Sequence, residues 1–207
     1  MVRQQLFWIV KIFEKNLMAD LSFYFRQKYR IPSSRLKHWD YSSVGWYFVT
    51  ICTYQKYCYF GEIVGGEMKL SKIGKIVEKY WLEIPKHFKN IKLDEFIVMP
   101  NHIHGIIVIE YKIDKINVET RHGVSLQKNE NNFNQFSKMV KNSISLIINQ
   151  FKSSVKRYAN KNKIPFHWQP RFYDHIIRNE KSLDEIRQYI KNNPLKWEND
   201  EENPKNN

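Results

Sequence analysis

The stretch that decides the fold runs from residue 96 to residue 109 and reads FIVMPNHIHGIIVI. Apolar and β-branched residues, which are typical of strands, occupy both sides of Pro100 and Asn101. Proline and asparagine favour turns, and a proline would interrupt a central strand if the run were continuous. We therefore predict two strands, over 96–99 and 102–109, joined at a tight turn.

The second of these strands carries a pair of histidines on one face. Side chains alternate along a strand, so His102, His104 and Ile106 share a face while Ile103 and Ile107 share the other. Residues two apart on a strand are roughly 6–7 Å apart, close enough for two imidazoles to bind one divalent ion. His-x-His is short and common, however, and two surface histidines at a sheet edge are the alternative.

The rest of the fold extends outward from this hairpin. Aromatic and β-branched content and apolar periodicity predict a strand at 45–53, a helix at 71–85, a helix at about 136–160, a strand within 168–178, and a last helix at 182–194. Ser182 and Glu185 have the spacing of a capping box at the start of that last helix. The order strand, helix, hairpin, helix, strand, helix predicts an α+β sandwich with helices packed on an antiparallel sheet.

Three segments fall outside these elements. Residues 1–27 form an aromatic and basic N-terminal extension whose role is open, and a short helix within 1–30 is the weakest of the predictions. The polar segment 111–135 has the composition of a long loop. Residues 198–207 are acidic and rich in asparagine, and we expect a disordered tail. The domain itself is expected to span 28–197.

Composition narrows the class of protein. The 207 residues carry a net charge of +13, which favours a polyanionic partner, nucleic acid before an anionic membrane surface. No apolar run approaches the roughly 20 residues that cross a bilayer, and the apolar N-terminal patch runs into Lys11, unlike a secretory signal. Cys52 and Cys58 are too few for a disulfide framework, so we expect reduced thiols in the cytoplasm.

The last helix adds two polar residues to the histidine pair. Tyr189 and Asn193 are spaced i, i+4 and face the same way. A tyrosine at the border of an apolar stripe is usually a packing residue, and an asparagine before a proline is usually a helix end. Together with two histidines they describe a reaction: a divalent ion on two imidazoles and an amide oxygen polarises a phosphate, and the tyrosine hydroxyl attacks phosphorus. The phosphotyrosine ester conserves the energy needed to rejoin the strand.

These residues carry a resemblance to a known family. The segment Met99–Ile106 resembles the His-hydrophobic-His motif of single-tyrosine transposases. The segments Trp168–Arg178 and Tyr189–Pro194 resemble the C-terminal signature of the REP-associated tyrosine transposases, and Arg35–Ile63 is similar to the same subfamily. The resemblance runs from about residue 28 to residue 197.

The resemblance implies a fold, a site and a reaction. The fold would be a ferredoxin-like or RNA-recognition-like α+β sandwich, with helices packed on one face of an antiparallel sheet and the nucleophile on the C-terminal helix. His102, His104 and Asn193 would bind Mg²⁺ or Mn²⁺, and Tyr189 would be the nucleophile, with Tyr173 as its rival. The reaction would be cleavage and rejoining of single-stranded DNA beside a hairpin through a 5′-phosphotyrosine link, by a bacterial protein acting as a monomer or a homodimer.

Basic residues spread along the chain are candidates for contacts with the DNA backbone. They are Arg30, Arg35, Lys37, Lys152, Lys156, Arg157, Arg171 and Arg178. Two alternatives stay open. A replication initiator or relaxase would share the histidine motif, and a non-catalytic nucleic-acid-binding module would retain the histidines without using them.

Overall fold

The computed structural model describes residues 39–111, 140–200 and 202–206. The extension at 1–27 and nearly all of the polar segment 111–135 lie outside these ranges, and so do Arg30, Arg35 and Lys37. The described residues from Asp40 onward belong to one unit. No helix in these ranges is both long and apolar enough to cross a bilayer.

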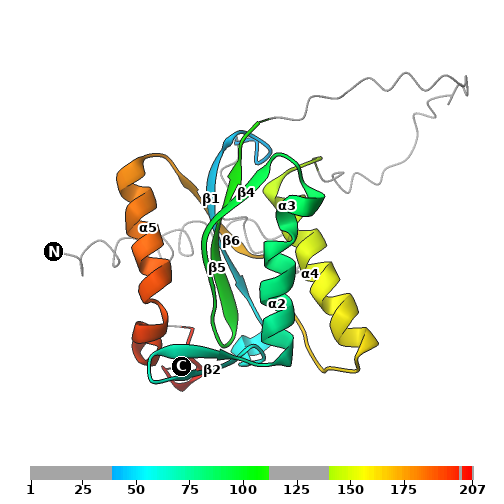
Figure 1. The fold of residues 1–207 in the computed structure, drawn as a ribbon, viewed down its shortest axis with the longest axis vertical. Helices are drawn as coiled ribbons and strands as arrows, with labels where there is room; N and C mark the ends of the chain where they lie inside the picture. The colour runs from blue at the N-terminus through cyan, green and yellow to red at the C-terminus, as the bar shows by residue number, and fades with distance from the viewer. Residues whose placement is uncertain (1–38, 112–139, 201, 207) are drawn as a thin grey trace, which may run out of the picture. The chain divides into compact units, whose positions relative to one another are not determined.

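A four-stranded antiparallel sheet forms the centre of this unit (Figure 1). Its strands lie in the order β4 (Ile91–Val98), β5 (His102–Ile109), β1 (Gly45–Cys52) and β6 (Tyr173–Ile177). The predicted strands at 45–53 and 102–109 are confirmed almost to the residue, and β4 begins earlier than predicted. Pro100 and Asn101 form the turn between β4 and β5, as expected from their turn chemistry.

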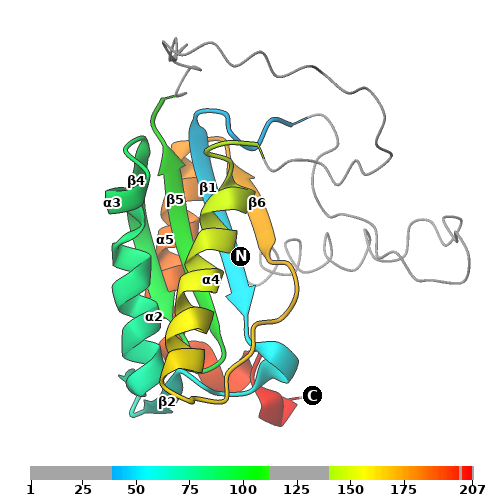
Figure 2. The ribbon, with the colours of Figure 1, turned by 90° about the vertical axis from the view of Figure 1, so that its right-hand side faces the viewer.

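Helices cover both faces of the sheet (Figures 1 and 2). Helices α2 (Lys72–Leu82) and α4 (Ile144–Lys161) pack on one face, and α5 (Glu180–Asn192) packs on the other. The path β1, α2, β4, β5, α4, β6 through this strand order is the ferredoxin-like arrangement. The predicted α+β class is confirmed. Helices α2 and α4 pack on one face of the sheet, as predicted, whereas α5 packs on the opposite face.

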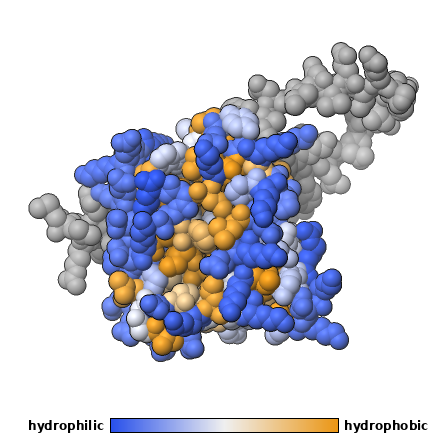
Figure 3. Space-filling view, viewed as in Figure 1, coloured by the Kyte–Doolittle hydropathy of each residue, from blue (hydrophilic) through white to orange (hydrophobic). Residues whose placement is uncertain are grey.

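Smaller elements connect these layers. They are η1 (Tyr54–Lys56), the hairpin β2 (Gly61–Val64) and β3 (Glu67–Leu70), α3 (Ile84–His87), η2 (Pro194–Asn199) and η3 (Pro204–Asn206). In the space-filling view, hydrophilic side chains cover the helices on both sides, with apolar side chains between them over the strands (Figure 3).

Alternation along the central strands builds two separate cores. Val49 and Ile103, which are fully buried, face α2 and α4 in the larger core. Phe48 and Ile106 face α5 and meet its apolar stripe in the smaller core. The period-2 pattern therefore assigned each side chain of β5 to the correct face. The histidines belong to the face that α5 covers.

Helix ends differ from the predicted ones because local caps decide them. Ser143 caps α4 by accepting a hydrogen bond from the Leu146 amide at 3.3 Å. Asn142, the residue before it, has a φ of 58°, which is outside the range of a right-handed helix. The helix predicted to start at about residue 136 therefore cannot run through this position. Asn179 caps α5 by accepting from the Ser182 amide at 2.8 Å. The capping box at Ser182 was therefore wrong, since an asparagine three residues earlier takes that role.

The C-terminal residues also depart from expectation. The described part of 198–207, expected as a disordered tail, includes the end of η2 and all of η3, and Asn203 is buried. The side chain of Asn101 donates hydrogen bonds to the backbone carbonyls of Lys56 and Glu202, which joins this segment to the turn before β5. Composition alone did not indicate this packing, because the contacts are with residues about a hundred positions away.

Gly105 on β5 supplies a test of the larger core. A Cβ at this position would overlap the indole of Trp81, a fully buried residue of α2. We expect Gly105→Ala to lower the free energy of unfolding by about 1–3 kcal/mol, because a closely packed core must shift to accept it. Urea denaturation measures the change.

Gly65→Asn is the matched control, since nothing lies within 4 Å of a Cβ there and asparagine tolerates the φ of +61°. We expect this control to change stability by less than about 0.5 kcal/mol. Equal stability of the two variants would contradict the close packing of Gly105 against Trp81.

Candidate active site

The start of β5 and the second half of α5 bring His102, His104 and Tyr189 into one cluster. His102 and His104 are 0% and 4% exposed, and their ring centroids lie 4.5 Å apart. The hydroxyl of Tyr189 lies 3.2 Å from Nε2 of His104. Asn193 follows one helical turn later and is 1% exposed. Residues 85 or more positions apart in the sequence thus share one site.

The hydrogen bonds around His102 fix which nitrogen carries its proton. Because the Asn101 amide nitrogen donates to two carbonyls, its oxygen is left to accept, and it lies 2.8 Å from Nδ1 of His102. The proton is therefore assigned to Nδ1, and the lone pair to Nε2. That Nε2 atom is buried and has no hydrogen-bond partner in the described protein.

His104 is held on both sides by hydroxyl groups. Thr50, its partner across the β1–β5 ladder, places Oγ1 2.9 Å from Nδ1, and Tyr189 lies at Nε2. Hydroxyls donate or accept, so Nδ1 can carry the proton and leave the Nε2 lone pair facing the tyrosine. Phe48 stacks on this imidazole with centroids 5.4 Å apart and meets the Tyr189 ring edge-on. The two functional rings therefore rest on one core aromatic.

Burial keeps both imidazoles neutral. It lowers the pKa of His104 to about 3, and it lowers the pKa of His102 well below the usual range, with a smaller contribution from the neighbouring His104. The cause is the cost of placing an imidazolium in a site shielded from water. Neutral imidazole is the form that binds metal ions.

The donor set fits a divalent ion. The buried side-chain oxygen of Asn193 has no hydrogen-bond partner in the described protein, like Nε2 of His102. Two buried acceptors without a donor are costly unless a ligand or water satisfies them. No group of three or more His, Cys, Asp or Glu in the described ranges could hold an ion. The family resemblance makes the amide oxygen of Asn193 the candidate third ligand. Two nitrogens and an oxygen suit Mn²⁺, and an oxygen-rich substrate would complete the set for Mg²⁺.

Tyr173, the rival nucleophile, lies on β6 at the same face of the sheet. Its ring packs edge-on against Phe48 at 6.5 Å. Burial, and secondarily the neighbouring Asp174, raises its pKa above that of an ordinary tyrosine, which disfavours the phenolate. The hydrogen bond to a histidine of the pair comes from Tyr189.

Ion pairs that the sequence analysis missed hold α5 against β4. Arg187 donates to both carboxylate oxygens of Asp94, at 2.8 and 2.6 Å, and Lys191 lies 3.2 Å from Glu95. The hydrogen bond from Arg187 lowers the pKa of the Asp94 carboxyl. Asp94 and Glu95 lie between Leu93 and Phe96, where the pairing register of β4 with β5 shifts. Two adjacent acidic residues in the middle of this strand were the signal that could have located the contact.

The predicted DNA contacts on α4 have different environments. The ammonium group of Lys152 donates to the carbonyls of Gln169 and Arg171 at 2.7 and 2.9 Å, and that of Lys156 donates to the carbonyl of Phe166. Burial lowers the pKa of Lys152 to about 8. Both lysines thus fasten α4 to the segment before β6.

The predicted arginines are more accessible than these lysines. Arg157 on α4, Arg171 before β6 and Arg178 after β6 are all exposed. Exposed arginine side chains are a common source of contacts to a phosphate backbone.

The Arg187–Asp94 pair supplies a test of how α5 is held. We expect Asp94→Arg and Arg187→Asp each to lower the free energy of unfolding by about 1–2 kcal/mol at neutral pH. The double variant should recover most of the lost stability, because exchanging the two residues places opposite charges side by side again. Since the pKa of Asp94 is lowered in the folded state, the advantage of the wild type over Asp94→Asn should shrink as the pH falls below about 4.

Chemical denaturation at several pH values measures these differences. Reversal of the exposed pair Lys69 and Glu67 is the control and should cost less than about 0.5 kcal/mol. A double variant no more stable than the two single ones would show that the pair does not hold α5.

Known proteins resemble this chain in sequence and in fold. No family model matches it. An uncharacterized protein of Haemophilus influenzae is 43% identical over 171 residues, which span 82% of this chain and 91% of that protein. The solved structure of a REP-associated tyrosine transposase bound to a REP hairpin aligns with a TM-score of 0.51 at 17% identity, over 80% of this chain and 74% of the other. This second likeness is one of fold.

Proposed function

Because the chain belongs to the same family as the Haemophilus influenzae protein and has the fold of a REP-associated tyrosine transposase, we propose that it cleaves and rejoins single-stranded DNA in DNA transposition. The observation that carries the proposal is the 3.2 Å contact between the Tyr189 hydroxyl and Nε2 of His104, beside a second imidazole with an unpaired Nε2. The proposed nucleophile and two proposed metal ligands, His102 and His104, therefore lie next to one another.

Tyr189 is the nucleophile in this proposal. Its oxygen forms a bond to phosphorus as the bond from phosphorus to the 3′ oxygen breaks, so the 5′ phosphate is joined to the protein and a 3′ hydroxyl leaves with the proton. An ordinary tyrosine has a pKa near 10 and attacks poorly at neutral pH. Mg²⁺ or Mn²⁺ on His102, His104 and Asn193 would supply the Lewis acid that polarises the phosphate. Rejoining is the same exchange in reverse.

Hairpin or single-stranded DNA is the proposed partner. The net charge of +13 supports a polyanion, and Arg157, Arg171 and Arg178 present exposed guanidinium groups. The structural neighbour is itself bound to a REP hairpin. Contacts by Arg30, Arg35 and Lys37, and a monomeric or homodimeric state, stay predictions.

A covalent-adduct assay tests the reaction. Labelled single-stranded oligonucleotides, tiled across the DNA that flanks the gene, are incubated with the protein and Mn²⁺ or Mg²⁺ and separated on a denaturing gel. We expect a labelled protein band that EDTA abolishes and that Tyr189→Phe lowers by at least about a hundredfold, because the phenylalanine lacks the attacking oxygen.

Tyr173→Phe is the matched control and should retain the adduct. An adduct lost in Tyr173→Phe and kept in Tyr189→Phe would reverse the tyrosine assignment. Tight binding of the oligonucleotides with no adduct under any metal condition would favour the non-catalytic binding module.

A further inference from the structure

Two exposed tyrosines stand at the short turn that follows β1. Tyr54 begins η1 and Tyr57 comes directly after it, and their side chains are 45% and 52% exposed. The ring of Tyr54 meets the exposed imidazole of His167 edge-on, with centroids 6.5 Å apart, and the ring of Tyr57 meets that of Tyr59 edge-on at 5.8 Å. Rings held by a neighbour in this way lose little freedom when a ligand packs on them.

The backbone between the two tyrosines adopts a conformation that is uncommon for side-chain-bearing residues. Gln55 and Lys56 have φ values of 50° and 56°, in the left-handed region, and neither is a glycine. Left-handed residues of this kind persist where the surrounding structure holds them, and they cluster at active sites and ligand clamps. The turn is therefore a candidate for a binding role.

Hydrogen bonds on two sides hold the turn in this shape. The Thr53 hydroxyl donates to the carbonyl of Tyr57 at 2.7 Å. The Tyr54 amide donates to the carbonyl of His167 at 2.9 Å, so the segment before β6 fixes the first tyrosine. Both tyrosines are thus anchored through their backbones, which leaves their side chains exposed.

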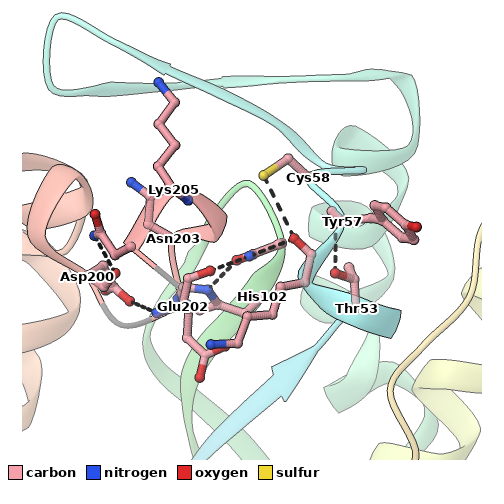
Figure 4. A network of polar contacts seen from close by, with 11 residues as sticks. Thr53, Tyr57, Cys58, His102, Asp200, Glu202, Asn203 and Lys205 are labelled. Carbon is pink, nitrogen blue, oxygen red and sulfur yellow. Dashed lines mark hydrogen bonds and ion pairs between the residues drawn. The ribbon is translucent and has the colours of Figure 1, made fainter.

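The turn is joined directly to the candidate active site. The Thr53 amide donates to the carbonyl of Asn101 at 2.8 Å, and the Asn101 side chain donates to the carbonyl of Lys56 at 3.0 Å. Asn101 is the residue before His102. Figure 4 shows Thr53 and Tyr57 to one side of His102, with the Tyr57 ring directed away from the histidine. A strand bound at the histidines would therefore have an exposed aromatic turn beside it.

The chemistry of this surface suits single-stranded DNA. Proteins bind single strands with basic surfaces and with aromatic rings on which the bases stack. The segment that pairs with the end of β1, where the Gln169 amide donates to the carbonyl of Cys52 at 3.0 Å, also carries the exposed Arg171. Together with a net charge of +13, these features favour a polyanion that has flat, partly apolar groups.

We propose that Tyr54 and Tyr57 stack on unpaired bases of the single-stranded DNA that the candidate active site would cut. This inference rests on the proposed function and adds to it the side chains that hold the bases. Every base has a flat face, so stacking here would hold the strand with little dependence on its sequence.

Fluorescence anisotropy of labelled single-stranded oligonucleotides tests the proposal. The probe is the tightest binder among the oligonucleotides tiled across the flanking DNA, and EDTA removes the divalent ions that the proposed cleavage requires. We expect the double variant Tyr54→Leu with Tyr57→Leu to bind at least about fivefold more weakly than the wild type, because stacking of one base commonly contributes a factor of about 5 to 150. Tyr54→Phe with Tyr57→Phe keeps both rings and should bind within about twofold of the wild type.

Tyr111→Leu is the matched control. Tyr111 is 49% exposed, like the two tyrosines of the turn, but it follows the end of β5 that lies opposite His102. Its replacement should leave the affinity for the oligonucleotide unchanged.

Abasic oligonucleotides test the stacking itself. Each nucleotide of the probe is replaced in turn by an abasic one, and the wild type should lose affinity where a stacked base is removed. In the double leucine variant the same abasic probes should bind as tightly as the intact probe, since the rings that the bases contact are gone. The series on the wild type also decides the question if the leucine variant folds poorly.

Three results would overturn the proposal: wild-type affinity in the leucine variant, an equal loss in Tyr111→Leu or in the phenylalanine variant, or an abasic series that changes nothing. An adduct formed by a protein that shows any of these results would leave the proposed reaction standing without this surface. The expected loss of affinity with no adduct would reject the reaction and keep the surface. A wild type that binds no oligonucleotide would remove both the DNA partner and this inference.

Discussion

The pairing of β1 with β5 is the constraint on which the rest of the structure depends. These two strands are the middle of the sheet, and their register sets Thr50 opposite His104 and Phe48 opposite Ile106. A slip of one residue would turn both histidines into the core under α2 and α4, because side chains alternate with a period of two. The apolar residues on both faces of β5 oppose that slip, so the folding energy of the two cores also fixes the site.

Given that register, the site follows from burial and a small number of hydrogen bonds. Thr50 and Asn101 each bond Nδ1 of one histidine, and Phe48 supports the rings of His104 and Tyr189. Desolvation keeps the imidazoles neutral, with Nε2 of His102 without a partner in the described protein and Nε2 of His104 facing the Tyr189 hydroxyl. The interaction of Arg187 with Asp94 holds the helix that carries the tyrosine. The supports come from β1, from the turn between β4 and β5, and from the contact of α5 with β4, which is why the cluster needs the whole fold.

Much of this could be predicted from the sequence, and the limits have physical causes. Alternation in residues 102–109 predicted the face of the histidines, and i, i+4 spacing placed Tyr189 with Asn193. Helix starts were less certain, since Asn179 and Ser182 both have capping side chains and only the backbone conformation before α5 decides between them. Asp94 was missed because its partner, Arg187, lies in another element. A pattern in one segment carries no information about a long-range contact.

The central claim is that His102, His104 and Asn193 form one divalent-metal site next to Tyr189. A crystal of the protein soaked in Mn²⁺ and measured at a wavelength where manganese scatters anomalously tests it most directly. The account predicts one strong anomalous peak at about 2.0–2.5 Å from Nε2 of both histidines and from the side-chain oxygen of Asn193. A peak bound elsewhere, or an empty cluster in a crystal that holds manganese at other positions, would contradict it.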